Sequence, residues 1–319
     1  MFTRIAVLGA GIMGYGIALD FARCVADVRL LDVDDDTVQC GLTMIDLSLR
    51  VMREEGAMTD DEARRVRANI RPFTDLAAAV ADADMVLEGL PERLDLKHSV
   101  LRQADNFAPE HAVFVTNTSS LRPSEIFAVL PPARRTRCAL AHYFQPAEVI
   151  PLVEIMGIPE TDEAVLTAMR DLYLSNNKVP VRVRKELPGL SVNRIQMAVW
   201  REVLWQLQNG VMDKEDLDMV LPYGPALRWA TTGPLTVMDL GGLDTACPVA
   251  DNIFKDLDNA DSVLPVLREL RDAGHYGLKT GRGFFDYPEE ERTTVKDAYV
   301  RRLTRQLALS MRTMKERKK

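Results

Sequence analysis

His142 is the side chain in this sequence best suited to act as a general base. It lies in the apolar run Ala139–Phe144, ahead of a proline turn, whereas the other three histidines lie in charged or loop segments, where we expect them at the surface. An imidazole can take the hydroxyl proton of a secondary alcohol while hydride leaves for a nicotinamide. A lone histidine on an apolar strand is more often a hydrogen-bonded core residue, so its neighbours must decide between the two interpretations.

A carboxylate twelve residues later favours the catalytic interpretation. Glu154 lies in a second apolar run, Leu152–Ile155, and the two runs are separated by Pro146 and Pro151. Two short extended segments joined in this way can fold back and meet. A carboxylate beside the ring would fix the imidazole tautomer and stabilise the imidazolium, and a buried glutamate without such a partner is costly. We therefore expect His142 and Glu154 to form a pair.

The string GAGIMG, residues 9–14, follows an apolar run and opens a helical pattern. In that context the glycines allow a tight turn, close backbone approach to a pyrophosphate and packing of the helix on the strand, and free N–H groups at the helix start hold the phosphates. Such a string alone is a weak signal, because glycines also serve plain turns. The predicted cofactor contacts here are Gly9, Gly11, Ile12, Met13 and Gly14.

Asp32 lies 18 residues after Gly14, at the end of the second predicted strand, Val28–Leu31. A carboxylate there can accept hydrogen bonds from the adenosine ribose and would repel a 2′-phosphate. Three more aspartates, residues 34–36, add to the negative field. The cofactor predicted from this unit is therefore NAD rather than NADP, with an acidic turn as the alternative interpretation.

Two polar positions complete the candidate site. Ser119 follows the apolar run Val113–Thr116, and the carboxyl ends of parallel strands are where open α/β sheets bind ligands. Asn193 opens the first helical pattern after Pro188 and Gly189. Taken alone, Ser119 is better explained by a capping turn and Asn193 by a helix start.

Apolar runs alternate with helical patterns up to Glu186, and only helical patterns follow it. The alternation predicts an α/β fold, a Rossmann-type mostly parallel sheet, and the remainder predicts an all-α C-terminal domain. We expect a NAD-binding domain over residues 1–186, a helical substrate and dimerisation domain over 187–290, and a basic amphipathic helical tail over 291–319. In that tail Val300, Leu303, Leu307, Met311 and Met314 recur at helical spacing.

The composition of the chain limits the classes of partner that we expect it to bind. The 319 residues carry a formal net charge of −7, so nucleic acid is not expected as a partner. Four widely separated cysteines suggest neither a metal site nor disulfides, which fits a reducing, cytoplasmic compartment. The longest early uncharged stretch is broken by glycines and is too short to cross a bilayer, so no membrane span is expected.

Seven strings in order resemble the 3-hydroxyacyl-CoA dehydrogenase family, over about Arg4 to Tyr287. They are GAGIMG, LEGLPERLDLK, NTSSL, HYFQP followed by PLVEI, PGLSVNR, GPLTVMDLGGLDT and GLKTGRGFFDY. The segment LRWATTGP is closer to the L-carnitine and L-gulonate dehydrogenase branches. The resemblance implies a homodimer joined through the helical domain and reversible oxidation of an L-3-hydroxyacyl-CoA to the 3-oxoacyl-CoA.

The resemblance also assigns roles to single residues. It implies that His142 is the base, that Glu154 orients it, and that Ser119 and Asn193 hydrogen-bond the reacting oxygen and nearby substrate. It places further residues near NAD, namely Glu92, Lys97, Ser119, Gln145 and Lys279. Family members hold CoA with a helical hairpin in which a lysine follows a serine by seven residues.

That hairpin is where this sequence departs from the family. The register places Ser48 at the serine and Glu55, an acid, at the lysine, with Arg53 as a neighbouring cation that can substitute. We expect an acyl-CoA substrate contacted by Ser48, Arg53, Ser119 and Asn193. The alternatives are the same chemistry on a 3-hydroxy acid without CoA, such as carnitine or a sugar acid, and a non-enzymatic NAD-binding protein. The tail is expected to pack on its own domain or a dimer partner, with anionic CoA or a membrane surface as its alternative ligand.

Overall fold

The computed structural model describes residues 2–317, with side chains as far as residue 310. Contacts divide the chain into two compact units. The first comprises residues 1–193 and Val300–Leu307, and the second comprises Arg194–Tyr299 and the chain after Ala308. Part of the predicted tail therefore belongs to the first unit. The side chains of Met311 and Met314, two positions of the predicted apolar face, lie outside the described residues.

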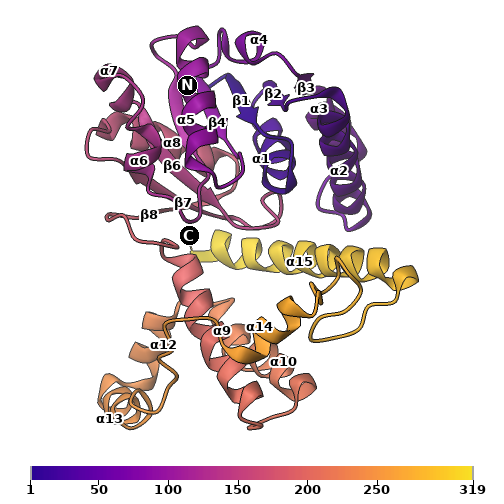
Figure 1. Ribbon diagram of the computed structural model, residues 1–319, viewed down its shortest axis with the longest axis vertical. Helices are drawn as coiled ribbons and strands as arrows, with labels where there is room; N and C mark the ends of the chain where they lie inside the picture. The colour runs from indigo at the N-terminus through magenta and orange to yellow at the C-terminus, as the bar shows by residue number, and fades with distance from the viewer. Residues whose placement is uncertain (1, 318–319) are drawn as a thin grey trace. The chain divides into compact units, whose positions relative to one another are not determined.

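The first unit is built on an eight-stranded sheet in the order β3-β2-β1-β4-β5-β6-β7-β8 (Figure 1). All neighbouring strands are parallel except β6 and β7, which are antiparallel. The strands are β1 (Arg4–Leu8), β2 (Asp27–Leu31), β3 (Ile70–Phe73), β4 (Met85–Glu88), β5 (Val113–Thr116), β6 (Cys138–Tyr143), β7 (Leu152–Gly157) and β8 (Val179–Arg182). The mostly parallel sheet predicted from the alternating pattern is confirmed. The sequence reading missed β3, in which Pro72 interrupts the apolar run, as proline does in edge strands.

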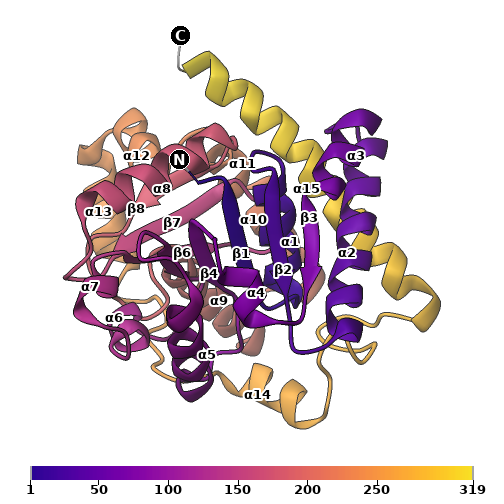
Figure 2. The ribbon, with the colours of Figure 1, turned by 90° about the horizontal axis from the view of Figure 1, so that it is seen from above.

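Helices cover both faces of this sheet (Figure 2). On one face lie α1 (Ile12–Ala22), α2 (Asp35–Glu54), α3 (Asp60–Ala68) and α8 (Glu163–Ser175). On the other lie α4 (Leu76–Val80), α5 (Leu94–Phe107) and α6 (Pro123–Phe127), while the short α7 (Pro132–Arg135) precedes β6. Thr59 and Glu62 form a reciprocal capping box at the start of α3.

The second unit is helical, apart from isolated bridges at Arg282. Its helices are α9 (Val192–Gln208), α10 (Lys214–Tyr223), α11 (Pro225–Trp229), α12 (Pro234–Gly241), α13 (Leu243–Ile253), α14 (Pro265–Asp272) and α15 (Glu289–Arg317). The first two residues of α9 and the segment Val300–Leu307 of α15 belong to the first unit. Among the described residues, none of these helices combines the length and the apolar character that crossing a bilayer requires. The cytoplasmic location stays a prediction.

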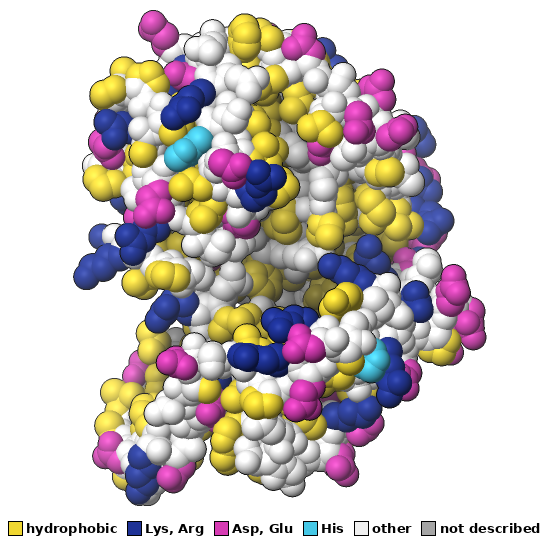
Figure 3. All heavy atoms as spheres, viewed as in Figure 1, with side chains coloured by type: hydrophobic (Ala, Val, Ile, Leu, Met, Phe, Trp, Pro, Cys, Tyr) yellow, Lys and Arg dark blue, Asp and Glu magenta, His cyan; other side chains and the backbone are white. Residues whose placement is uncertain are grey.

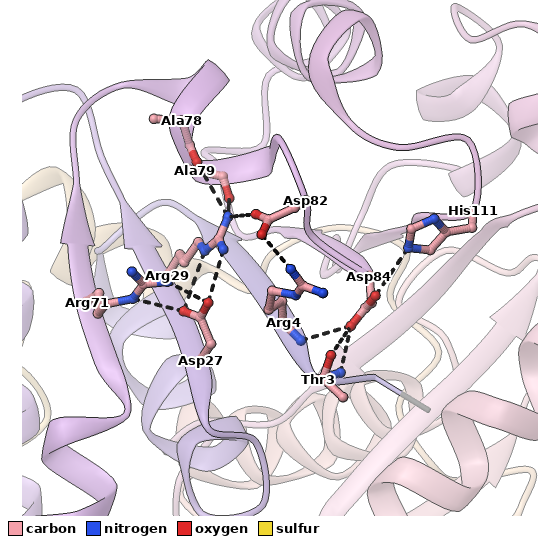
Figure 4. A network of polar contacts seen from close by, with 10 residues as sticks. All are labelled: Thr3, Arg4, Asp27, Arg29, Arg71, Ala78, Ala79, Asp82, Asp84 and His111. Carbon is pink, nitrogen blue, oxygen red and sulfur yellow. Dashed lines mark hydrogen bonds and ion pairs between the residues drawn. The ribbon is translucent and has the colours of Figure 1, made fainter.

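A polar network ties together the ends of the strands opposite the glycine turn (Figure 4). Arg29, buried in β2, bonds the carbonyl oxygen of Ala79 and pairs with Asp27 and Asp82. Asp84, directly before β4, accepts hydrogen bonds from both the N–H and the hydroxyl of Thr3 at 2.7 Å. The contacts of Thr3 with Asp84 hold the start of β1 against the start of β4, and the glycine turn follows at the other end of β1.

Asp84 gives this network a pH dependence. Burial alone would raise its pKa, but hydrogen bonds from Thr3, the N–H of Arg4 and the ring of His111 outweigh burial and lower the pKa to about 2. Because the folded pKa lies below the ordinary value near 4, the stabilisation is complete above pH 4 and is lost as the pH falls through 2. We expect Asp84→Asn to lower the free energy of unfolding by about 2 kcal/mol at pH 7. Urea unfolding across this pH range should show the difference shrinking toward pH 2. Asp171→Asn, at an exposed carboxylate of α8, is the control, and a difference independent of pH would contradict the assignment.

Candidate active site

The glycine turn lies between β1 and α1, next to the point where the strand order reverses between β1 and β4. The N–H of Gly9 donates to the carbonyl oxygen of Leu31 at 2.7 Å, which joins the turn to the end of β2. There the Asp32 carboxylate accepts hydrogen bonds from Ala10 N–H at 2.6 Å and from Val33 N–H at 2.7 Å. The predicted ribose-binding acid and the phosphate-binding turn therefore lie side by side.

The local packing shows why two of these positions are glycine and fits a dinucleotide. A Cβ on Gly14 would lie 1.7 Å from the carbonyl oxygen of Gly9, so α1 could not approach the turn with any larger residue there. A Cβ on Gly11 would meet no protein atom within 4 Å, and Gly11 and Ile12 are exposed at the start of α1. The half-buried Met13 packs on the core beneath them. Open backbone N–H groups at a helix start are the arrangement that holds a pyrophosphate.

His142 and Glu154 face each other directly across the antiparallel pair β6 and β7. The ring Nδ1 lies 2.8 Å from Glu154 Oε2, and both side chains are buried. Because a carboxylate only accepts hydrogen bonds, Nδ1 carries the hydrogen and Nε2 of the neutral ring is an acceptor. The Ser119 hydroxyl, 3.2 Å from Nε2, donates to it. The expected pair of His142 and Glu154 is thus present in the structure, and Ser119 adjoins it.

Glu154 makes a second set of contacts through its other oxygen. Oε1 accepts hydrogen bonds from the N–H groups of Ser191 at 2.8 Å and Val192 at 3.1 Å, where α9 begins. Burial alone would raise the pKa of this carboxyl, but the His142 ring and the two N–H groups outweigh burial and lower it. Glu154 is therefore held ionised. Asn193, the next residue in the helix, is half-buried.

A second polar cluster holds the Ser119 turn. Glu92 accepts hydrogen bonds from the Ser119 N–H at 2.6 Å and from the Thr118 hydroxyl at 2.8 Å, and it lies 3.7 Å from Lys97 Nζ. Lys97 is buried and pairs with the buried Glu88 at 2.7 Å. Burial raises the pKa of Glu88 despite this pair. Glu92 and Lys97, which the resemblance places near NAD, are thus neighbours of the Ser119 turn.

The remaining predicted cofactor residues are at the surface. Gln145 is exposed in the loop after β6, and Lys279 is exposed in the second unit. Their places beside NAD stay predictions. Of the other histidines, only His111 is exposed as expected, since His98 and His275 are half-buried.

Sequence reasoning missed the residues that hold the loop after β6. Lys178 is buried, and its Nζ donates to the carbonyl oxygens of Ala147 at 2.6 Å and Ile150 at 2.9 Å. It also pairs with the buried Asp20 of α1 at 3.1 Å. A lysine directly before an apolar strand was the only signal, and it does not distinguish a buried cation from an ordinary surface one.

The helical hairpin of α2 and α3 differs from the expected CoA-binding arrangement. The Ser48 hydroxyl is buried and donates to the buried Glu148 at 2.9 Å. Arg53 pairs with Asp60 at 2.9 Å. Glu55 pairs with Arg301 at 3.0 Å and with Arg305 at 2.5 Å, both from the segment Val300–Leu307. Both predicted CoA contacts in the hairpin, Ser48 and Arg53, and the acid at the lysine position, Glu55, are therefore paired within the protein.

The chain matches the two domain models of one enzyme family over most of its length. Residues 4–187 match the 3-hydroxyacyl-CoA dehydrogenase NAD binding domain, and residues 189–287 match the C-terminal domain of the same enzymes. The chain is 29% identical to 5-formyl-3-hydroxy-2-methylpyridine 4-carboxylate 5-dehydrogenase of Mesorhizobium japonicum, over 95% of this chain and 96% of that protein. It is 32% identical to human mitochondrial hydroxyacyl-coenzyme A dehydrogenase, over 89% and 91% of the two chains. A crystal structure of the pyridine carboxylate enzyme, described as an NAD+ dependent dismutase, superposes with a TM-score of 0.89 at 29% identity, covering 98% of this chain and 99% of that one.

The packing of the glycine turn predicts different outcomes for two alanine substitutions. Gly11→Ala introduces a methyl group that meets no protein atom, so we expect a stability loss below about 1 kcal/mol. The same methyl group would project where a pyrophosphate approaches, so the Kd for NADH should rise at least tenfold, about 1.4 kcal/mol. Gly14→Ala, whose methyl group meets the Gly9 carbonyl, should lose stability as well as binding. Fluorescence titration and thermal unfolding measure both, and an unchanged Kd in Gly11→Ala would refute this cofactor geometry.

Proposed function

The chain belongs to the 3-hydroxyacyl-CoA dehydrogenase family, and from this premise we propose that it oxidises the secondary hydroxyl of a 3-hydroxy acid that carries no coenzyme A, or runs the reverse reduction. The protein is an NAD-dependent dehydrogenase of that family. The observation that carries the proposed chemistry is the hydrogen-bonded series from Glu154 through His142 to Ser119. The substrate class rests on the contacts of Ser48 and Glu55.

His142 serves as the base in this proposal. Its Nε2, the accepting nitrogen because Nδ1 donates to Glu154, takes the hydroxyl proton of the substrate. Glu154 stays ionised and stabilises the imidazolium that forms. Ser119 and Asn193 hold the reacting oxygen within reach of the ring. NAD, bound at the glycine turn and Asp32, supplies the hydride acceptor.

The substrate class follows from the hairpin of α2 and α3. The resemblance implies CoA contacts through a serine and a lysine there, but Ser48 is buried on Glu148 and the lysine position is Glu55. A carboxylate repels CoA phosphates, and this one is already paired with two arginines. These contacts favour a substrate without CoA over the acyl-CoA expected from the resemblance alone.

Arg301 and Arg305 lie on the segment Val300–Leu307, which is part of the first unit. Val300, Leu303 and Leu307 pack against its larger apolar core, and Thr304 is buried between them. This part of the tail therefore packs on the first unit of its own chain, which is one of the packing partners expected from the sequence pattern. A second observation supports the proposed substrate class. The pyridine carboxylate enzyme, whose named substrate contains no CoA, superposes on 98% of this chain.

A panel of carbonyl substrates tests the proposal. NADH oxidation should be measured with acetoacetate, 3-dehydrocarnitine, a sugar keto-acid and acetoacetyl-CoA. We expect one of the free acids to be reduced with kcat/KM at least 100-fold above that of acetoacetyl-CoA, about 2.7 kcal/mol in transition-state binding. Preference for acetoacetyl-CoA would overturn the substrate class and leave the chemistry standing.

The matched variant for this panel is His142→Gln. With the preferred substrate, we expect kcat to fall by about 10²- to 10⁴-fold while the Kd for NADH stays near the wild-type value, because only proton transfer is lost. Near-normal turnover would show that another group is the base.

We also infer that the second unit joins two copies of the chain. Within the described residues, α9, α12 and α13 contain no fully buried side chain. Large apolar side chains are exposed instead, and apolar groups reach the surface over α12 and α13 (Figure 3). Examples are Leu235, Leu240 and Phe254, each more than 70% exposed. Contiguous exposed apolar surface of this kind marks association sites.

Light scattering measures this association directly. We expect a mass of twice the 35.7 kDa chain for the wild type. Replacing Leu240 and Phe254 together by Glu should shift the mass to that of one chain, because each charge would have to be buried in the interface. NADH binding, which depends on the first unit, is the control for folding. A monomeric wild type would contradict the inference.

A further inference from the structure

We propose that Leu190 is a positioning residue of the active site, and that its left-handed backbone conformation aims the two N–H groups that hold Glu154. The inference rests on the proposed function of Glu154 and adds to it a residue that touches neither substrate nor cofactor. Leu190 lies in the linker between β8 and α9, residues 183–191.

The backbone at Leu190 is unusual for its residue type. Its φ is +51°, and the preceding Gly189 has a φ of +76°. Among the described residues outside glycine, only Asn177 shares a positive φ, and asparagine tolerates this region far better than leucine. A non-glycine residue with positive φ is strained, so the surrounding structure must hold it in that conformation. Such strained residues cluster at active sites.

The conformation has a direct geometric consequence. Two successive left-handed residues turn the chain so that the next two N–H groups, of Ser191 and Val192, both point at Glu154 Oε1. With negative φ at residue 190 the chain would leave in another direction, and these donors would separate from the carboxylate. The same turn sets the direction in which Asn193 follows.

The Leu190 side chain keeps the turn in place beneath the dyad. Leu190 is 4% exposed and packs with Leu140 and Met156. Leu140 lies two residues before His142 in β6, and Met156 lies two residues after Glu154 in β7, so all four strand residues share one face of the sheet. A small cavity beside this cluster is lined by both Ser119 and Leu190.

The linker is also tied at its other end. The Glu186 carboxylate accepts hydrogen bonds from the N–H of Ser124 at 2.8 Å and from its hydroxyl at 2.7 Å. Ser124 follows the Ser119 turn by five residues. The linker is thus bonded through Glu186 to the segment that carries Ser119, and through its last N–H groups to Glu154. Leu190 lies between these two sets of hydrogen bonds.

Two substitutions separate backbone conformation from packing. Leu190→Val keeps an apolar side chain but introduces β-branching, which opposes positive φ. Leu190→Asn loses the apolar packing but adopts positive φ readily. If the side chain matters only for packing, Leu190→Asn should lower kcat more than Leu190→Val does. If the backbone conformation matters, Leu190→Val should lower kcat more.

The experiment compares thermal unfolding, kcat, the Kd for NADH and the Glu154 carboxyl pKa in both variants. The pKa is followed by ¹³C NMR and assigned with Glu154→Gln. In Leu190→Val we expect kcat to fall by roughly 10- to 100-fold with an unchanged Kd for NADH, as for a displaced catalytic group. The Glu154 pKa should rise, because two donors to the ionised form are lost. Leu190→Asn should unfold at a lower temperature than the wild type yet retain most of kcat and the low pKa.

Three results would overturn the proposal. They are a wild-type Glu154 pKa in Leu190→Val, an equal loss of kcat in both variants, and a greater loss in Leu190→Asn. The carboxyl titration needs no turnover, so it tests the positioning role even if the wild type reduces none of the panel substrates, which would count against the proposed function alone.

Discussion

The ionised carboxylate of Glu154 is the group on which the arrangement of this site depends. One oxygen fixes the tautomer of His142, and the other receives two backbone N–H groups at the start of α9. A buried carboxylate without such partners would cost several kcal/mol or become protonated. Here three donors keep it charged, so the imidazole presents its accepting nitrogen to the Ser119 side. The strand pairing of β6 and β7 places the two side chains directly opposite each other.

Around this dyad the protein keeps several other buried charges, each with a partner. Lys97 lies on Glu88 beneath the Ser119 turn, and Lys178 lies on Asp20 beneath the loop after β6. Breaking such a pair leaves an unpaired buried charge, which typically costs about 3–5 kcal/mol. These pairs therefore hold loops in one conformation rather than add net stability. Both loops flank the strand ends at which the cofactor and the reacting oxygen are expected.

The departure from the family pattern at the end of α2 is compensated within the protein. Glu55 occupies the position at which the resemblance implies a lysine, and the arginines that neutralise it lie about 250 residues later in α15. Exposed ion pairs alone contribute little, but here they accompany apolar packing by Val300, Leu303 and Leu307 on the core. Glu55 is thereby paired with the protein's own C-terminal segment, which is the observation behind the proposed substrate class.

The sequence by itself determined the elements whose signals are local. Short-range spacing and backbone sterics account for the strand, glycine turn and helix around residue 11, the acid at residue 32 and the alternation that gives the sheet. The pairing of His142 with Glu154 could also be predicted from the sequence, because a separation of twelve residues with two prolines limits how the two strands can meet. Only the tertiary structure decided which N–H groups receive Glu154, why Leu190 adopts a glycine-like conformation, and what covers Glu55. Those contacts join residues 37 to 250 positions apart or depend on backbone angles against residue preference, and no local pattern encodes either.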